Sequence, residues 1–290
     1  MSDSTAAGVA KARHIESLAP EATRIIDDPY AQYFYFGASL VNLVGHGAGL
    51  WLFDMLMPGA HEMLIARTRC IDDLVMQEAH ENGACQVVLL GAGYDMRGAR
   101  LKLGEKKVKV FEVDQPAVQS RKREKVAAIP NLSNPVHFVP VDFASQRVDE
   151  ELEKVADYDP KAKTLIILEG VSQYIPAEAM LTTLKAMDGV TGPGSCFFFS
   201  YVDERIQREP AQLGDAKTVQ KIMSMAASVG EPWINFYAQS EIAGLLEASS
   251  KFRRVSDVSA DEISQKSFPA ERRIPPEKLL LIERYVVARK

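Results

Sequence analysis

The stretch VVLLGAGYDMRG, from Val87 to Gly98, joins a short apolar run to a glycine-rich turn. Four apolar residues followed at once by Gly-Ala-Gly predict a buried strand that ends in a loop whose backbone comes close to another group. Either that group is a nucleotide-like cofactor, or the loop is simply a tight strand-to-helix turn. A dinucleotide fingerprint has a third glycine at its sixth position, and Met96 stands there instead. The loop therefore favours a ligand that contains a nucleoside but no diphosphate.

Further apolar runs alternate with helical stretches, as expected of an α/β fold around a parallel sheet. Five strands are expected, beginning at Gln86 (QVVLL), Val108 (VKVFEV), His137 (HFVPV), Thr164 (TLIIL) and Cys196 (CFFFS). Two later candidates, FRRV from Phe252 and LLLIERYVVA from Leu279, are separated by a segment rich in Ser, Pro and charge that we expect to be a loop. The sequence thus predicts a doubly wound, mostly parallel sheet with an antiparallel C-terminal edge hairpin.

We expect one domain over residues 1–290, with a helical cap (1–62), a core (63–200), an insert that forms a lid (201–250) and the hairpin (251–290). The cap contains FYFGASLVNLVGHGAGLWLFDMLMPG, whose aromatic, Gly and Met residues predict either an apolar lid over a small hydrophobic ligand or plain packing. In the insert, KIMSMAASVGEPW predicts an amphipathic helix followed by a turn.

Composition argues against several classes of function. The 34 basic and 39 acidic side chains give a net charge of −5 with no long basic tract, so we expect no nucleic-acid partner. Cys70, Cys85 and Cys196 are widely spaced, which favours a reducing compartment and no metal site. The N-terminus lacks the apolar core of a secretory signal, and the apolar run in GAGLWLFDMLMPG is short and interrupted by Asp54. We therefore expect a cytoplasmic protein without a membrane contact.

Acidic residues follow the next three predicted strands. Asp114 ends the second strand, Asp142 precedes Phe143 after the third, and Glu169 follows the fourth. Open α/β sheets bind ligands at these carboxyl ends, and an acid at the tip of the second strand can hydrogen-bond a ribose diol. Glu112 faces the same side one step earlier, where it either holds the loop or a neighbouring arginine, or forms a buried structural ion pair.

The helix expected before the first strand carries Arg67 beside an apolar stripe that includes Leu64 and Ile71. This places Arg67 near the end of the sheet where the glycine loop emerges. The alternative is that Arg67 is a solvated helix residue or a partner of Asp72.

The segments ARTRCIDDLV, LLGAGYDMRGARL, FEVDQPAV, VPVDF and LEGVSQYIP occur in this order along the chain. Together they resemble the leucine carboxyl methyltransferase superfamily, including its bacterial branch of S-adenosylmethionine-dependent methyltransferases. DDPYAQYF and GEPWINFY also resemble segments of that family, so the resemblance covers most of the chain. It implies a Rossmann-like class I methyltransferase fold with S-adenosylmethionine as cofactor.

The resemblance also implies contacts with the cofactor for individual residues. Arg67 is expected to bind the methionine carboxylate, and Glu169 to lie by the methionyl amino group. Gly91 and Gly93 let the backbone approach the cofactor, and Asp114 binds the ribose hydroxyls. Asp142 and Phe143 hold the adenine, and Arg13 reaches the cofactor as a basic residue of the N-terminal segment. The segment between Arg13 and DDPY differs in length from that of some relatives.

The expected reaction is methylation of an oxygen atom, carboxylate or hydroxyl, on a small-molecule acceptor. Carboxyl methylation of a protein C-terminus and cofactor binding without turnover are the alternatives, and Met96 disfavours a nicotinamide-dependent oxidoreductase. A sulfonium methyl group is already activated, so the protein chiefly aligns the acceptor. His46, Tyr174 and Tyr201 are the side chains to inspect as a base for a hydroxyl acceptor, but each has a structural alternative and we assign no catalytic base.

Overall fold

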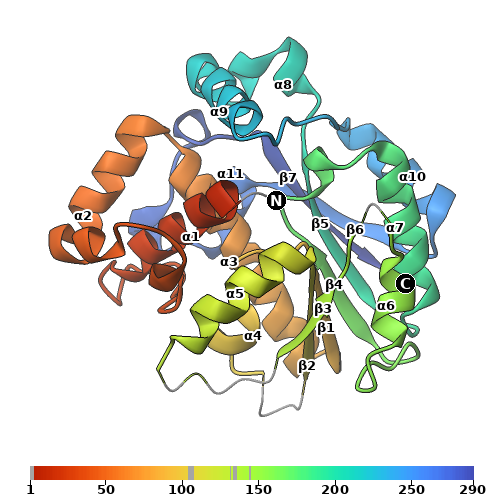
Figure 1. Cartoon of the computed structure of the whole chain (residues 1–290). Helices are drawn as coiled ribbons and strands as arrows, with labels where there is room; N and C mark the ends of the chain where they lie inside the picture. The colour runs from red at the N-terminus through yellow and green to blue at the C-terminus, as the bar shows by residue number, and fades with distance from the viewer. Residues whose placement is uncertain (1–2, 104–107, 131, 133–135, 144) are drawn as a thin grey trace.

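A seven-stranded sheet in the order β3-β2-β1-β4-β5-β7-β6 forms the centre of the molecule (Figure 1). The computed structural model describes residues 3–103, 108–130, 132, 136–143 and 145–290. The parallel strands are β1 (Gln86–Leu90), β2 (Lys109–Asp114), β3 (Val136–Pro140), β4 (Thr164–Leu168) and β5 (Cys196–Val202). β7 (Glu283–Arg289) pairs antiparallel with both β5 and β6 (Arg253–Ser259). The predicted parallel sheet with an antiparallel C-terminal hairpin is confirmed.

The inner strands are buried on both faces, and successive residues enter two different hydrophobic cores. Leu89 and Ile167 pack on one face, while Leu90 and Leu168 pack on the other. The first face is covered by α1 (Asp3–Ser17), α3 (Ala60–His80) and α11 (Ala260–Ser267), and the second by α6 (Val148–Glu153), α7 (Ala177–Gly189) and α10 (Ile242–Ser249). Burial on both sides explains why these strands appear in the sequence as continuous apolar runs.

Shorter connections and the insert complete the fold. Between the strands lie α4 (Arg97–Arg100) and α5 (Pro116–Ala127), and the insert contains α8 (Arg205–Arg208) and α9 (Ala216–Ser228). Asp215 caps α9, because its carboxylate accepts a hydrogen bond of 2.7 Å from the Thr218 N–H. α9 confirms the amphipathic helix predicted in the insert.

The segment between β6 and β7 is not only a loop, as predicted, because it contains α11. The helix begins at a capping box, in which Glu262 accepts a hydrogen bond of 2.8 Å from the Ser259 N–H. Its buried Ala260 and Ile263 belong to the core that α3 also enters. The prediction gave weight to the polar composition of the segment and overlooked the Ser-x-x-Glu signal at its start.

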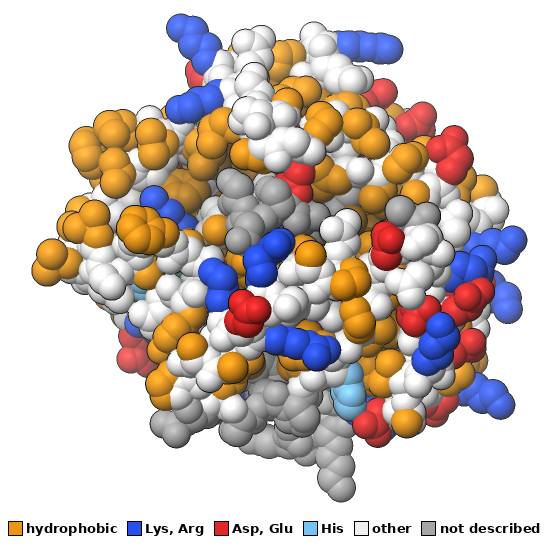
Figure 2. All heavy atoms as spheres, in the orientation of Figure 1, with side chains coloured by type: hydrophobic (Ala, Val, Ile, Leu, Met, Phe, Trp, Pro, Cys, Tyr) orange, Lys and Arg blue, Asp and Glu red, His pale blue; other side chains and the backbone are white. Residues whose placement is uncertain are grey.

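The apolar cap segment forms α2 (Ala38–Leu56), and much of it faces outward. Leu43 is 82% exposed and Trp51 67% exposed, whereas Phe53 is buried. Figure 2 shows hydrophobic side chains gathered on the side where Figure 1 places α2. Neither predicted role, lid or plain packing, accounts for these outward side chains.

Among the described residues no single helix is long and apolar enough to cross a membrane. The helices α2 and α3 meet the length and composition criteria only when they are taken together, and a bend of 113° separates them.

Candidate functional site

The glycine loop follows β1 and packs against Val171 in the loop that follows β4. Gly91 and Gly93 have φ angles of 70° and 47°, a region that disfavours side chains with a Cβ atom. The Gly91 N–H donates a hydrogen bond of 2.8 Å to the Val113 carbonyl oxygen. A Cβ atom on Gly91 would lie 2.5 Å from Cγ2 of Val171. Both the backbone conformation and the close packing therefore require glycine at position 91.

Gly91→Ala is expected to lower the free energy of unfolding by roughly 2–5 kcal/mol, the sum of a left-handed backbone and an overpacked contact. Gly83→Ala is the matched control, because Gly83 has a φ of 74° but nothing within 4 Å of its added Cβ. Urea denaturation of both variants separates the two contributions. Equal losses at the two positions would show that the Val171 contact costs nothing.

Asp114 holds the glycine loop from the end of β2. Its Oδ2 accepts a hydrogen bond of 2.7 Å from the Gly93 N–H, and its Oδ1 accepts one of 2.7 Å from the Gln115 N–H. A carboxylate has about four lone-pair sites, so these two bonds leave capacity for ribose hydroxyls. The contact with the ribose itself stays a prediction.

Glu112 forms a buried ion pair, as one of the sequence alternatives expected. Its Oε2 lies 2.6 Å from the Lys122 ammonium nitrogen, and both side chains are buried. Burial raises the pKa of Glu112 to about 7, although the charge of Lys122 acts in the opposite direction. Lys122 also donates to the Asp95 carbonyl oxygen, so this pair connects β2 to the glycine loop.

Arg67 is buried, and the alternatives that made it a solvated residue or a partner of Asp72 are wrong. Its Nε donates to Glu169 Oε1 at 2.8 Å, and its Nη1 donates to Glu283 Oε2 at 2.7 Å. Asp72 is instead bound by Arg97, whose Nε lies 2.8 Å from Oδ1 of Asp72.

Glu169 connects two arginines at the carboxyl end of β4. Besides Arg67, it binds Nη1 of Arg97 at 2.6 Å through Oε2. Burial alone would raise the pKa of Glu169, but the positive charges of Arg97, Arg67 and Arg13 outweigh it and lower the pKa to about 2. Glu169 is therefore ionised at neutral pH. Sequence reasoning missed Arg97 and Glu283; Arg97 stood within the quoted loop motif, whereas Glu283 had no local signal.

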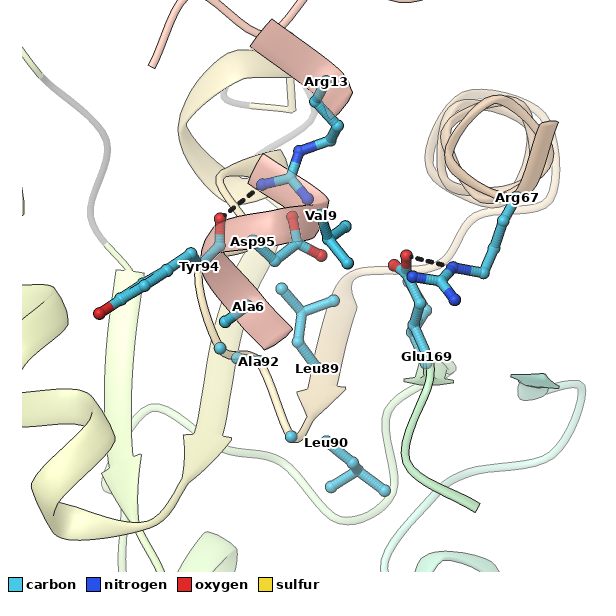
Figure 3. Close-up of a pocket in the computed structure, with 13 residues that line it drawn as sticks. Ala6, Val9, Arg13, Arg67, Leu89, Leu90, Ala92, Tyr94, Asp95 and Glu169 are labelled. Carbon is cyan, nitrogen blue, oxygen red and sulfur yellow. Dashed lines mark hydrogen bonds and ion pairs between the residues drawn. The ribbon is translucent and has the colours of Figure 1, made fainter. Parts of the chain in front are cut away.

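Arg13 brings α1 onto the glycine loop. Its Nη2 donates a hydrogen bond of 2.7 Å to the Tyr94 carbonyl oxygen, as Figure 3 shows, and its Nε binds Asp28 Oδ2 at 2.8 Å. The described structure thus joins a residue near the N-terminus to the first βα turn.

Three neighbouring cavities share residues at this end of the sheet. The first, of about 40 Å³, is lined by a set that includes Arg13, Arg67, Gly91, Gly93, Asp95 and Glu169 (Figure 3). The second, of about 410 Å³, is lined by Gly91, Asp114 and Phe143 among others. The third, of about 240 Å³ and mainly apolar, shares Arg67 with the first and Tyr174 with the second; we call it the apolar cavity. Phe53 and Met57 are the contributions of the α2 region to it.

Asp142 is the predicted residue that the structure does not bring into these cavities. It is exposed, and its Oδ2 accepts a hydrogen bond of 2.8 Å from the Ser145 hydroxyl. Phe143, the next residue, is 45% exposed and lines the second cavity. The predicted contact of Asp142 with adenine therefore stays a prediction.

The three side chains considered as bases have different surroundings. His46 lies 3.8 Å from a Glu16 carboxylate oxygen and is not among the described residues that line the three cavities. The Tyr201 hydroxyl donates to Asp257 Oδ2 at 3.0 Å, which is a structural contact. Tyr174 lines both the second and the apolar cavity.

The chain was also compared with known proteins in sequence and in fold. The sequence model of leucine carboxyl methyltransferases matches residues 6–188. The chain belongs to this family. YktD of Bacillus subtilis, provisionally named an S-adenosyl-L-methionine-dependent methyltransferase, is 35% identical over 195 residues, which are 64% of this chain and 60% of that protein. A similarly named protein of Mycolicibacterium smegmatis is 33% identical over 215 residues, 72% of this chain and 70% of its own length.

The match thus spans less than two thirds of the length of the Bacillus relative YktD. At the level of the family, the cofactor named for these relatives is the one that the sequence predicted, S-adenosylmethionine.

Solved structures identify the fold of this family member. A provisionally assigned methyltransferase from Thermobifida fusca superposes with a TM-score of 0.59 at 19% identity, covering 96% of this chain and 94% of that one. A DUF574 family protein from Streptomyces avermitilis gives a TM-score of 0.61 at 14% identity, covering 96% of each chain. The fold is the Rossmann-like class I methyltransferase fold, as predicted.

Proposed function

We propose that this protein uses S-adenosylmethionine to methylate an oxygen atom of a small-molecule acceptor. The observation that carries the proposal is the charge pattern of the first cavity. Arg13, Arg67, Asp95 and Glu169 line it, and this balanced set of two cations and two anions suits a zwitterion such as the methionyl end of the cofactor. Gly91 also lines the second cavity, which has room for the nucleoside.

The residues present fit the cofactor in a specific way. Nη2 of Arg67 makes no hydrogen bond to any described residue, so it can donate to the methionyl carboxylate. Glu169 is ionised and can accept a hydrogen bond from the methionyl amino group. The first cavity has room for only a few water molecules as it stands. We therefore expect α1, whose Ala6 and Val9 line this cavity, to shift outward when the methionyl end binds.

When bound, S-adenosylmethionine would supply an activated methyl group to the acceptor oxygen, the C–S electron pair would remain on sulfur, and the proton of a hydroxyl acceptor would pass to the bulk solvent. The chain holds and orients both molecules. α1 and α9 both line the apolar cavity. The Thr5 hydroxyl donates a hydrogen bond of 2.8 Å to Glu231 Oε2, which ties α1 to the segment after α9.

Calorimetric titration with S-adenosylmethionine, S-adenosylhomocysteine and NAD in parallel tests the cofactor. Binding of the first two without NAD supports the proposal, and binding of NAD alone overturns it. Transfer of an isotopically labelled methyl group to a panel of hydroxyl and carboxyl compounds then tests catalysis. A non-catalytic role would be favoured if the cofactor binds tightly but the methyl group is transferred neither to any of these compounds nor to a peptide with a free C-terminus.

Asp114→Asn is expected to weaken S-adenosylmethionine binding by roughly 10- to 100-fold, because a hydrogen bond to a charged group contributes about 1.5–3 kcal/mol. The amide oxygen of Asn can accept from only one of the two N–H groups that Asp114 binds, those of Gly93 and Gln115, so urea denaturation must first show that the variant is folded. Calorimetry measures the affinity, with Asp73→Asn on the exposed side of α3 as the control. An unchanged affinity in Asp114→Asn would show that the ribose lies elsewhere.

A further inference from the structure

We infer that the apolar cavity is the acceptor site and that it selects an apolar molecule carrying a neutral hydroxyl group over one carrying a carboxylate. This rests on the proposed function and adds the substrate class to it. Within the family, it separates this chain from the leucine carboxyl activity that gives the family its name.

The walls of the cavity come from distant parts of the chain. Val9 of α1, Met63 of α3 and Ile222 of α9 contribute apolar side chains. The volume of about 240 Å³ lies just below the roughly 300–1,000 Å³ typical of small-ligand pockets. The cavity therefore suits a small apolar molecule better than a peptide tail.

Two buried polar atoms in this wall have no hydrogen-bond partner in the part of the chain that the structure describes. They are Oε1 of Gln173 and Nε1 of Trp233, and both residues line the cavity. Gln173 is only 3% exposed. The main-chain carbonyl oxygen of Gln173 accepts a hydrogen bond of 2.8 Å from the Ile234 N–H, which places the segment containing Trp233 next to it. Leaving buried polar atoms unpaired is costly. Both atoms are inaccessible to water in the free protein, so pairing them with a ligand requires the two side chains to turn toward the cavity when it is occupied.

A hydroxyl group matches this pair of atoms. It can donate to the Gln173 oxygen and accept from the Trp233 N–H, whereas a carboxylate only accepts. Burial raises the pKa of Tyr174, although the Trp233 N–H acts in the opposite direction; that N–H is near Tyr174 but lacks the geometry of a hydrogen bond. The Tyr174 hydroxyl therefore stays neutral at physiological pH.

The charged side chains that line the cavity also favour a hydroxyl group over a carboxylate. Arg67 and Glu283 are the charged side chains among the described residues that line the cavity. Nη1 of Arg67 already binds both oxygens of Glu283, at 2.9 and 2.7 Å, and its Nε binds Glu169. The single cation in the wall is thus neutralised by two carboxylates, and its remaining Nη2 donor is the one assigned above to the methionyl carboxylate, so an acceptor carboxylate finds no further donor on Arg67.

The test compares two probes of similar shape, 4-propylphenol and 4-propylbenzoate, on the full chain at pH 7.5 with and without saturating S-adenosylhomocysteine. Trp51 and Trp233 are the two tryptophans of the sequence, and Trp51 is exposed. Trp51→Phe therefore makes Trp233 the only indole fluorophore, whose emission reports occupancy of the cavity. We expect the phenol to bind at least tenfold more tightly than the benzoate.

Gln173→Met tests the polar contact without a large change of volume. It should weaken phenol binding about tenfold, leave benzoate binding unchanged and not destabilise the fold, because it removes a buried unpaired oxygen. A structural role for Gln173 would instead lower the stability of this variant. Gln77→Met, at an exposed position of α3, is the matched control.

The possible outcomes separate this inference from the proposed function. Benzoate binding as tight as phenol binding, or no effect of Gln173→Met on the phenol, overturns the selection of a hydroxyl group. Binding of neither probe to protein saturated with S-adenosylhomocysteine overturns the assignment of the cavity. Absence of S-adenosylhomocysteine binding overturns the proposed function itself.

Discussion

Arg67→Ala is expected to abolish measurable binding of S-adenosylmethionine and to lower the free energy of unfolding by about 3–5 kcal/mol. The family resemblance already implies weaker binding, because it places Arg67 on the methionine carboxylate. The structure adds the second, because Arg67 is the partner of both Glu169 and Glu283. Its removal leaves Glu283 without a counter-charge among the described residues and Glu169 with Arg97 alone, and the two buried carboxylates then repel each other. Urea denaturation and calorimetry measure the two effects.

Arg69→Ala is the matched control for this experiment. Arg69 lies on the same helix and pairs with Asp73 at 2.9 Å at the surface, where Arg69 is partly exposed and Asp73 exposed; its Nη1 also donates a hydrogen bond of 3.1 Å to the Ile25 carbonyl oxygen. Exposed ion pairs contribute at most about 1 kcal/mol. A similar loss of stability in the two variants would contradict the buried network. Wild-type affinity for the cofactor in Arg67→Ala would show that the site is misplaced.

Glu169→Gln is expected to lower the free energy of unfolding at pH 7 by about 3 kcal/mol, the value that corresponds to a shift of its pKa from 4.5 to about 2. The folded-state pKa is the lower one, so the carboxylate stabilises the fold above pH 4.5. This contribution is lost as the pH falls from 4.5 through 2. The difference in stability between wild type and variant should therefore shrink steadily over that range.

Denaturation curves at pH 7, 5, 4 and 3 measure this dependence. Glu124→Gln, at an exposed position of α5, controls for the general effect of losing one negative charge. A difference that stays constant down to pH 3 would mean that the folded-state pKa of Glu169 is not lowered. Because Glu169 binds both Arg67 and Arg97, the variant should also bind the cofactor more weakly.

Much of the fold was predictable from local sequence patterns. The five parallel strands were expected within a residue or two of their observed limits, apart from a longer β5. Parallel strands buried on both faces require continuous apolar runs, so their positions are visible without the structure. The predicted loop before β7 was wrong because its capping signal was overlooked. The exposed face of α2 was not predictable, because the sequence of an apolar segment does not show which of its faces will pack against the rest of the protein.

By itself, the sequence determined the positions of the core strands along the chain, the glycine loop and the acids at the strand ends, because local periodicity and turn chemistry encode them. Only the tertiary structure decided which charges meet. Glu283 binds Arg67 across 216 residues, and Arg13 reaches the glycine loop across 81. The apolar cavity likewise depends on α1, α3 and α9 lying next to one another. Such contacts arise where distant segments pack at one end of the sheet, and no local pattern records them.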